Sequence, residues 1–116
     1  MSHTIEHSIV IPNKGRDAYL QRCLLSIIES ARHCGLADDQ WEVIVVGEWL
    51  VGRWNDGTPI RFIEADTTPP FLKLREGEPA PFWKNHLLNV GIYAAKGDVI
   101  TLLDSDMLVG PRFMVT

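Results

Sequence analysis

Runs of β-branched and aliphatic residues alternate along this chain with stretches in which apolar residues recur every three or four positions. The runs at 8–12, 41–46, 60–65 and 99–103 predict four strands. The periodic stretches at about 17–35 and 82–95 predict two amphipathic helices, each with one stripe that faces a core. The order strand, helix, strand, strand, helix, strand predicts an α/β fold, with a mostly parallel sheet and flanking helices.

The two predicted helices differ in how sharply their apolar stripes are defined. In the first, Asp17 is the expected N-cap and Gly35 follows the end. Its buried stripe is expected to hold Leu20, Cys23, Leu24, Ile27, Ile28 and Ala31. In the second, the buried side is expected to hold Trp83, Leu87, Val90 and Ala94, with Leu88 and Gly91 flanking. A proline-rich loop at 66–81 precedes it, and loops of this length are usually functional or mobile.

The fourth predicted strand leads directly into two carboxylates, Asp104 and Asp106. Its apolar run is typical of a central, buried parallel strand. Ligands of open α/β sheets bind just beyond the carboxyl ends of such strands. Two acids held this close repel each other unless a cation lies between them, and their hard oxygens suit Mg²⁺ or Mn²⁺. We therefore expect a metal site here, with Asp106 as the direct ligand and Asp104 bound to a ribose or to a metal-bound water; the alternative is a pair of solvated surface acids.

Other polar residues are expected at the same edge of the sheet. Right-handed crossovers bring the carboxyl ends of parallel strands together, which predicts that Pro12 and Glu48 lie near Asp104 and Asp106. We expect the three acids to share one pocket. On spacing alone, Glu48 is as readily an ordinary loop acid as a ligand of a base or sugar, and Lys84 is better explained as a solvated lysine.

Composition excludes some classes of protein and leaves others open. The chain has 116 residues, enough for one domain, with 46% hydrophobic and 22% charged residues. Its net charge of −4 and the lack of a basic cluster argue against a nucleic-acid or anionic-membrane surface. Neither a secretory signal nor a membrane-spanning stretch is evident, so we expect a cytoplasmic protein and leave open membrane association of a larger parent enzyme. Cys23 and Cys34 are expected to be reduced thiols.

Several segments together resemble family 2 glycosyltransferases of the GT-A fold. Residues 8–12 (SIVIP), followed by the helix that contains Tyr19 and Leu20, are similar to the opening of that family, and residues 42–46 (EVIVV) look like its second strand. The block from Lys84 to Asp106, with Asn89, Gly91 and the Lys-Gly-Asp at 96–98, resembles its most recognisable region. The resemblance covers nearly the whole chain.

The resemblance implies a nucleotide-sugar donor, most often a UDP-sugar, and a divalent metal held through the Asp-x-Asp motif. It places Pro12 and Glu48 around the nucleoside and Lys84 against the nucleotide. It assigns Asp104 to the ribose or sugar side and Asp106 to the metal. Mg²⁺ or Mn²⁺ is the implied cofactor, and an unknown acceptor is the second substrate.

The chain also departs from that family. Gly47 and Glu48 stand where the family usually has two aspartates. Such domains need roughly another hundred residues, so we expect residues 1–116 to form only the donor-binding portion of an inverting enzyme, with the general base beyond Thr116. Such an incomplete fold should expose apolar surface and self-associate. The alternatives are a non-catalytic nucleotide-sugar-binding or interaction module and, ranked last, a nucleotidyltransferase.

Overall fold

The computed structural model describes residues 5–15, 17–48, 57–68, 75–78 and 82–114. Much of the predicted loop at 66–81 therefore lies outside the described residues. Within these ranges the chain forms, in order, β1 (His7–Lys14), α1 (Asp17–His33), β2 (Trp41–Glu48), β3 (Ile60–Glu64), α2 (Lys84–Ala94) and β4 (Val99–Leu102). In the described part of the chain, neither helix combines the length and the apolar character needed to cross a bilayer.

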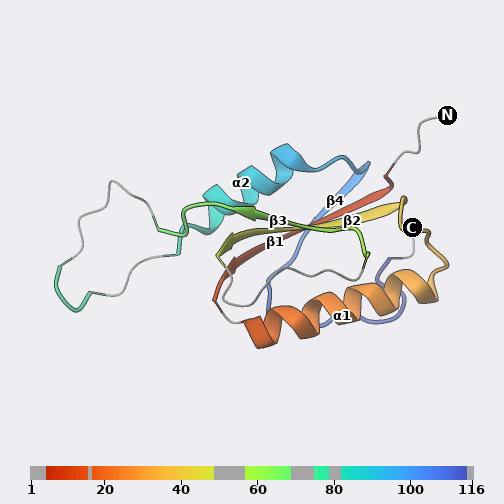
Figure 1. Ribbon diagram of the computed structural model, residues 1–116, viewed down its shortest axis with the longest axis horizontal. Helices are drawn as coiled ribbons and strands as arrows, with labels where there is room; N and C mark the ends of the chain where they lie inside the picture. The colour runs from red at the N-terminus through yellow and green to blue at the C-terminus, as the bar shows by residue number, and fades with distance from the viewer. Residues whose placement is uncertain (1–4, 16, 49–56, 69–74, 79–81, 115–116) are drawn as a thin grey trace.

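The four strands form one sheet in the order β3-β2-β1-β4, and every neighbouring pair is parallel. Helix α1 covers one face of the sheet and α2 covers the other (Figure 1). Strand β1 is central: Ile9 pairs with Val43 of β2 on one side and with Thr101 of β4 on the other. The predicted α/β architecture, an incomplete Rossmann-like sheet with flanking helices, is confirmed.

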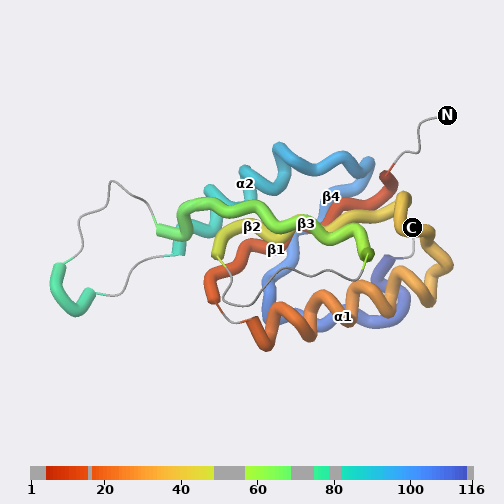
Figure 2. Tube along the Cα trace, viewed as in Figure 1, coloured from red at the N-terminus to blue at the C-terminus, as the bar shows by residue number. Residues whose placement is uncertain are grey.

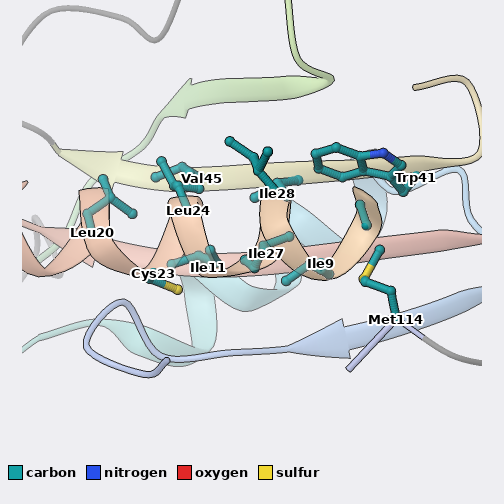
Figure 3. Packing of buried hydrophobic residues seen from close by; sticks show 12 residues of the cluster. Ile9, Ile11, Leu20, Cys23, Leu24, Ile27, Ile28, Trp41, Val45 and Met114 are labelled. Carbon is teal, nitrogen blue, oxygen red and sulfur yellow. The ribbon is translucent and has the colours of Figure 1, made fainter. Parts of the chain in front are cut away.

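Helix α1 packs on the sheet through the predicted stripe. All six of its expected core residues are buried. They meet side chains that alternate along β1 and β2, as the two-residue period of a strand requires (Figure 3). The strand residues of this layer are Ile9, Ile11, Trp41, Val43 and Val45. This layer is the larger of the two cores.

Helix α2 covers the opposite face with a smaller core. The helix begins at Lys84, later than the predicted 82, and Leu87 and Gly91 are its buried residues. Val90 and Ala94, which were expected on the buried side of this helix, are partly buried and pack against this core. Trp83 is also partly buried. The helix comes closest to the sheet at Gly91. A Cβ atom there would lie 2.2 Å from Val10 Cγ1, so glycine allows the helix axis to approach β1 closely.

Strand β4 differs from its prediction as a central, buried strand. It pairs only with β1, and among the described residues no strand lies on its other side. Val99 and Leu102 are each 48% exposed, and Ile100 is 40% exposed. An apolar run fixes the type of element but not its place in the sheet, and here it forms an edge.

A buried polar network ties the α2–β4 connection to the amino-terminal end of the sheet. Glu42, only 4% exposed, accepts hydrogen bonds from the Ser8 hydroxyl (2.6 Å), the Lys96 backbone N–H (2.7 Å) and Arg61 (2.8 Å). Ser8 in turn accepts the Gly97 N–H at 2.7 Å. Burial alone would raise the pKa of Glu42, but these hydrogen bonds and the charge of Arg61 outweigh it and lower that pKa. The network fixes where β4 begins.

The segment after β4 turns back and runs along α1 (Figure 2). Ser26 accepts the Val109 N–H at 3.1 Å. One turn further on, Ser30 donates to the Pro111 carbonyl at 3.1 Å and accepts the Met114 N–H at 3.0 Å. Hydroxyls spaced four residues apart therefore satisfy backbone groups that would otherwise be left unpaired. The strand end that carries Asp104 and Asp106 is thereby anchored to α1.

Candidate functional site

The carboxyl ends of all four strands lie on one edge of the sheet. Strand β1 ends at Lys14, which is in register with Glu48 at the end of β2. Strand β3 ends at Glu64, and Asp104 follows β4 after a single residue. Polar side chains that are distant in sequence are therefore gathered where parallel α/β sheets usually bind ligands.

Four of the five predicted site residues line one pocket of about 320 Å³, which we call the aspartate pocket. Its lining consists of Pro12, Lys14, Phe82, Lys84, Asp104, Ser105 and Asp106. Lys84 is the first residue of α2, and its Nζ lies 2.7 Å from Oδ1 of Asp104. The pocket thus combines two lysines with two aspartates, a set that can hold both a phosphate group and a cation.

The Asp-Ser-Asp loop is held in a tight turn. The Asp104 carbonyl accepts the Met107 N–H at 3.1 Å and faces the thiol of Cys23 on α1, with a sulfur–oxygen distance of 3.9 Å. Burial, together with the negative charge of Asp106, raises the pKa of Cys23 to about 11. This thiol is therefore neutral, packs as a small apolar group and is a weak hydrogen-bond donor, and it holds the turn against the helix.

The start of α2 is also anchored to a neighbouring segment, which fixes the backbone position of Lys84. The Trp83 N–H donates to the Thr67 carbonyl at 2.7 Å, and Thr67 is buried. The Trp83 ring stacks on His86, with ring centroids 4.0 Å apart and planes 21° from parallel. The first turn of α2 is thus tied to the segment that follows β3.

The donor set of the aspartate pocket fits a divalent cation that is shared with a ligand. Asp104 and Asp106 offer hard oxygens, but no group of three or more His, Cys, Asp or Glu gathers here or elsewhere in the described part of the chain, so a cation in this pocket would need further ligands from a bound molecule or from water. Mg²⁺ is commonly held by one or two carboxylates together with substrate phosphates rather than by a complete protein cage. The residues present therefore suit a Mg²⁺ or Mn²⁺ ion completed by a diphosphate.

Glu48 lies in a different pocket from the two aspartates, so the described structure does not place the three acids in one shared pocket. It lines a pocket of about 570 Å³, the Glu48 pocket, with Gly47, Glu64, Ala65, Asp66 and His86. The reason is the strand order. Strand β2 lies between β3 and β1, so its end opens toward β3, whereas the aspartates follow β4 beyond β1. The two pockets occupy neighbouring stretches of the same edge.

Sequence reasoning missed some of the residues that line these pockets. Lys14 and Phe82 line the aspartate pocket. Glu64 and His86 line the Glu48 pocket. The position of Lys14 at the end of the first strand was the available signal, since Lys14 and Pro12 are two residues apart and so share a face of that strand. Nothing in the sequence distinguishes Glu64 from other strand-end acids.

Comparisons with known proteins give a likeness of fold. No family model and no curated protein matches the chain. A solved structure of S. aureus TarS, residues 1–349, superposes with a TM-score of 0.60 at 16% sequence identity, and TarS is a glycosyltransferase. The match covers 92% of this chain but 29% of that one, so this chain spans less than a third of the TarS structure.

Proposed function

We propose that this chain forms the donor-binding part of a glycosyltransferase that uses a nucleotide-sugar, with a UDP-sugar as the first candidate. The observation that carries the proposal is the aspartate pocket, in which Lys84, Asp104, Asp106 and Pro12 meet at the carboxyl edge of an all-parallel sheet. The likeness of fold to a glycosyltransferase supports it. The resemblance of the 84–106 block to family 2 glycosyltransferases supports the proposal separately, from the sequence alone.

In this proposal each residue of the pocket has a separate task. Lys84 and Lys14 face the diphosphate as charge-assisted donors. Asp104 accepts a hydrogen bond from the ribose or sugar, and Asp106 holds Mg²⁺ or Mn²⁺. When bound, the cation would neutralise charge on the departing diphosphate. Inverting transfer also needs a carboxylate base to deprotonate the acceptor hydroxyl, and we assign that base to a part of the enzyme beyond this chain.

One observation favours a second candidate, a non-catalytic module that binds a nucleotide-sugar or interacts with another chain. Among the described residues, the lining of the aspartate pocket contains no carboxylate besides Asp104 and Asp106. Both are assigned to the donor and its metal, which leaves none to act as the base. Binding without turnover by this chain agrees with either candidate, whereas turnover by the isolated chain would place the base within it.

Calorimetric titration of UDP, with and without Mn²⁺, tests the proposal. We expect Mn²⁺-dependent binding that Asp106→Asn weakens at least about tenfold, because a charged metal ligand is lost. Asp98→Asn is the matched control, since Asp98 is exposed at the opposite, amino-terminal edge of the sheet. Hydrolysis of a UDP-sugar is measured in parallel. UDP binding that ignores both Mn²⁺ and Asp106→Asn would refute the metal assignment.

A further inference from the structure

Asn13 sits at the end of β1 with its side chain almost completely buried, at 1% exposure. Its Nδ2 donates to the backbone carbonyl of Glu48 at 2.7 Å. Its Oδ1 is also buried, and none of the described residues donates a hydrogen bond to it. A buried amide oxygen without a partner costs stability. The gain from the Nδ2 hydrogen bond and the cost of the unpaired Oδ1 therefore oppose each other in the folding free energy, and a structural role alone does not account for Asn13.

Gly47, which precedes Glu48, makes this contact possible. It pairs with Asn13 across the β1–β2 ladder and has φ of +127°, a conformation that favours glycine. A Cβ atom here would lie 2.1 Å from the Asn13 carbonyl oxygen and 3.1 Å from Leu87 Cδ1. No side chain fits, so a pair of adjacent aspartates cannot occupy positions 47 and 48. Glu48 alone carries the acid at the end of β2.

Glu48 itself is exposed, and its side chain lines the Glu48 pocket. It is the last residue of β2 and is in register with Lys14 at the end of β1, so the regular sheet ends here. When Glu48 binds a ligand, both its side chain and its main chain must be ordered, and a main chain that is already fixed removes the second of these two costs. Asn13 supplies a direct restraint on the peptide that follows Glu48.

We propose that Asn13 is a positioning residue, which holds Glu48 so that its carboxylate can accept a hydrogen bond from the nucleoside part of the donor. This inference rests on the proposed function. It adds to that function a residue of β1 that lines neither pocket, and it gives a reason for a buried amide whose oxygen has no partner. Asn13 acts on the ligand only through Glu48.

A double-mutant cycle on UDP binding in the presence of Mn²⁺ tests this. Asn13→Leu removes the donor with nearly the same shape, and Asn13→Ala removes it without added bulk or charge. We expect each to weaken UDP binding about five- to tenfold, the effect of one such hydrogen bond. In a Glu48→Ala background the same changes should cost nothing further. Asn85→Ala on the exposed surface of α2 is the control for loss of an amide side chain.

Stability, measured by urea unfolding, separates positioning from a merely structural role. We expect the midpoint of Asn13→Leu to stay close to that of the wild type, because the change also removes the unpaired Oδ1. Asn13→Ala keeps the cycle informative should the bulkier leucine variant fail to fold. Two results would overturn the inference and leave the proposed function intact. One is a loss of UDP affinity in the Asn13 variants that multiplies with the loss caused by Glu48→Ala. The other is unchanged UDP affinity in the Asn13 variants. Absence of binding by the wild-type chain to UDP, CDP, ADP and GDP with Mn²⁺ would overturn the proposed function and the inference together.

Discussion

The ammonium group of Lys84 lies 2.7 Å from Oδ1 of Asp104. The lysine side chain, which comes from the start of α2, therefore pairs with one of the two carboxylates that are expected to bind the donor and its metal. The side chains are 46% and 53% exposed. An ion pair this open to water contributes at most about 1 kcal/mol. A pair this weak can exchange partners, and under the proposed function Lys84 would move to a phosphate while Asp104 would become free for the ribose.

Replacing Lys84 by methionine should separate these two roles. We expect Lys84→Met to bind Mn²⁺ alone as tightly as the wild type or a few-fold more tightly, because Asp104 no longer has a competing cation. The affinity for UDP in the presence of Mn²⁺ should fall about tenfold, because a charged phosphate donor is lost. Calorimetry measures both affinities. Lys96→Met, at the opposite edge of the sheet, is the control, and a parallel fall of both affinities would contradict the exchange.

Glu42 should make folding sensitive to acid. Its pKa is lowered in the folded chain, so it stabilises the native state above its usual value of about 4.5, and this contribution is lost as the pH falls through the lowered pKa. Glu42→Gln should reduce the free energy of unfolding at pH 7 by about 1–3 kcal/mol, since hydrogen bonds to a charged group are lost.

Urea unfolding at several pH values measures this effect. The gap between wild type and Glu42→Gln should narrow as the pH is lowered below 4.5. A gap that stays constant with pH would show that the carboxylate charge is not what the network stabilises. Glu29→Gln on the exposed side of α1 serves as the matched control.

Cys23 and Cys34 are both free thiols, as predicted, but they should differ in reactivity. Cys23 is fully buried with its pKa raised to about 11, whereas Cys34 is partly exposed. At pH 8 we expect a disulfide reagent to label Cys34 in the native chain and to leave Cys23 unmodified until the chain unfolds. Mass spectrometry of the labelled chain identifies the site. Rapid labelling of Cys23 in a Cys34→Ser variant would show that α1 does not cover it.

The same thiol gives an alkaline signature. An ordinary thiol pKa of 9.0 raised to about 11 favours the folded state below pH 9, and this advantage is lost between pH 9 and 11. Wild type should lose about 2–3 kcal/mol of unfolding free energy relative to Cys23→Ala across that range. Parallel pH profiles for the two proteins would contradict it.

The predictable parts of the fold are those in which a local sequence pattern is compatible with a single structure. The stripe of α1 has a clear period, and all six of its predicted core residues are buried. Strand position is different, because the run at 99–103 has the same apolar composition whether it lies in the centre or at an edge. Pairing partners distant in sequence decide this, and they place β4 beside β1 alone among the described strands.

The candidate site was predictable in part for the same reason. The meeting of Pro12, Lys84, Asp104 and Asp106 follows from the rule that parallel strands end on one edge. The separation of Glu48 follows from the strand order, which the sequence does not encode locally. The roles of Ser26 and Ser30 could not be predicted. A serine in the middle of a helix gives no sign in the sequence that its hydroxyl forms hydrogen bonds with the backbone of residues 109–114.

The exposed edge of β4 should make the isolated chain self-associate, as the sequence also predicted. Val99, Ile100 and Leu102 are 40–48% exposed, and Leu108 nearby in sequence is 67% exposed. A strand edge with unpaired backbone groups and apolar side chains is a template for pairing with another chain. We expect light scattering to show a mass that rises with concentration, and we expect Ile100→Lys to shift the chain toward monomer by placing a charge on that edge. The control is Arg22→Lys at an exposed position of α1. Arg61→Lys is unsuitable as a control because Arg61 binds Glu42. A monomer at all concentrations would mean that the edge of β4 is too short or too twisted to recruit a partner.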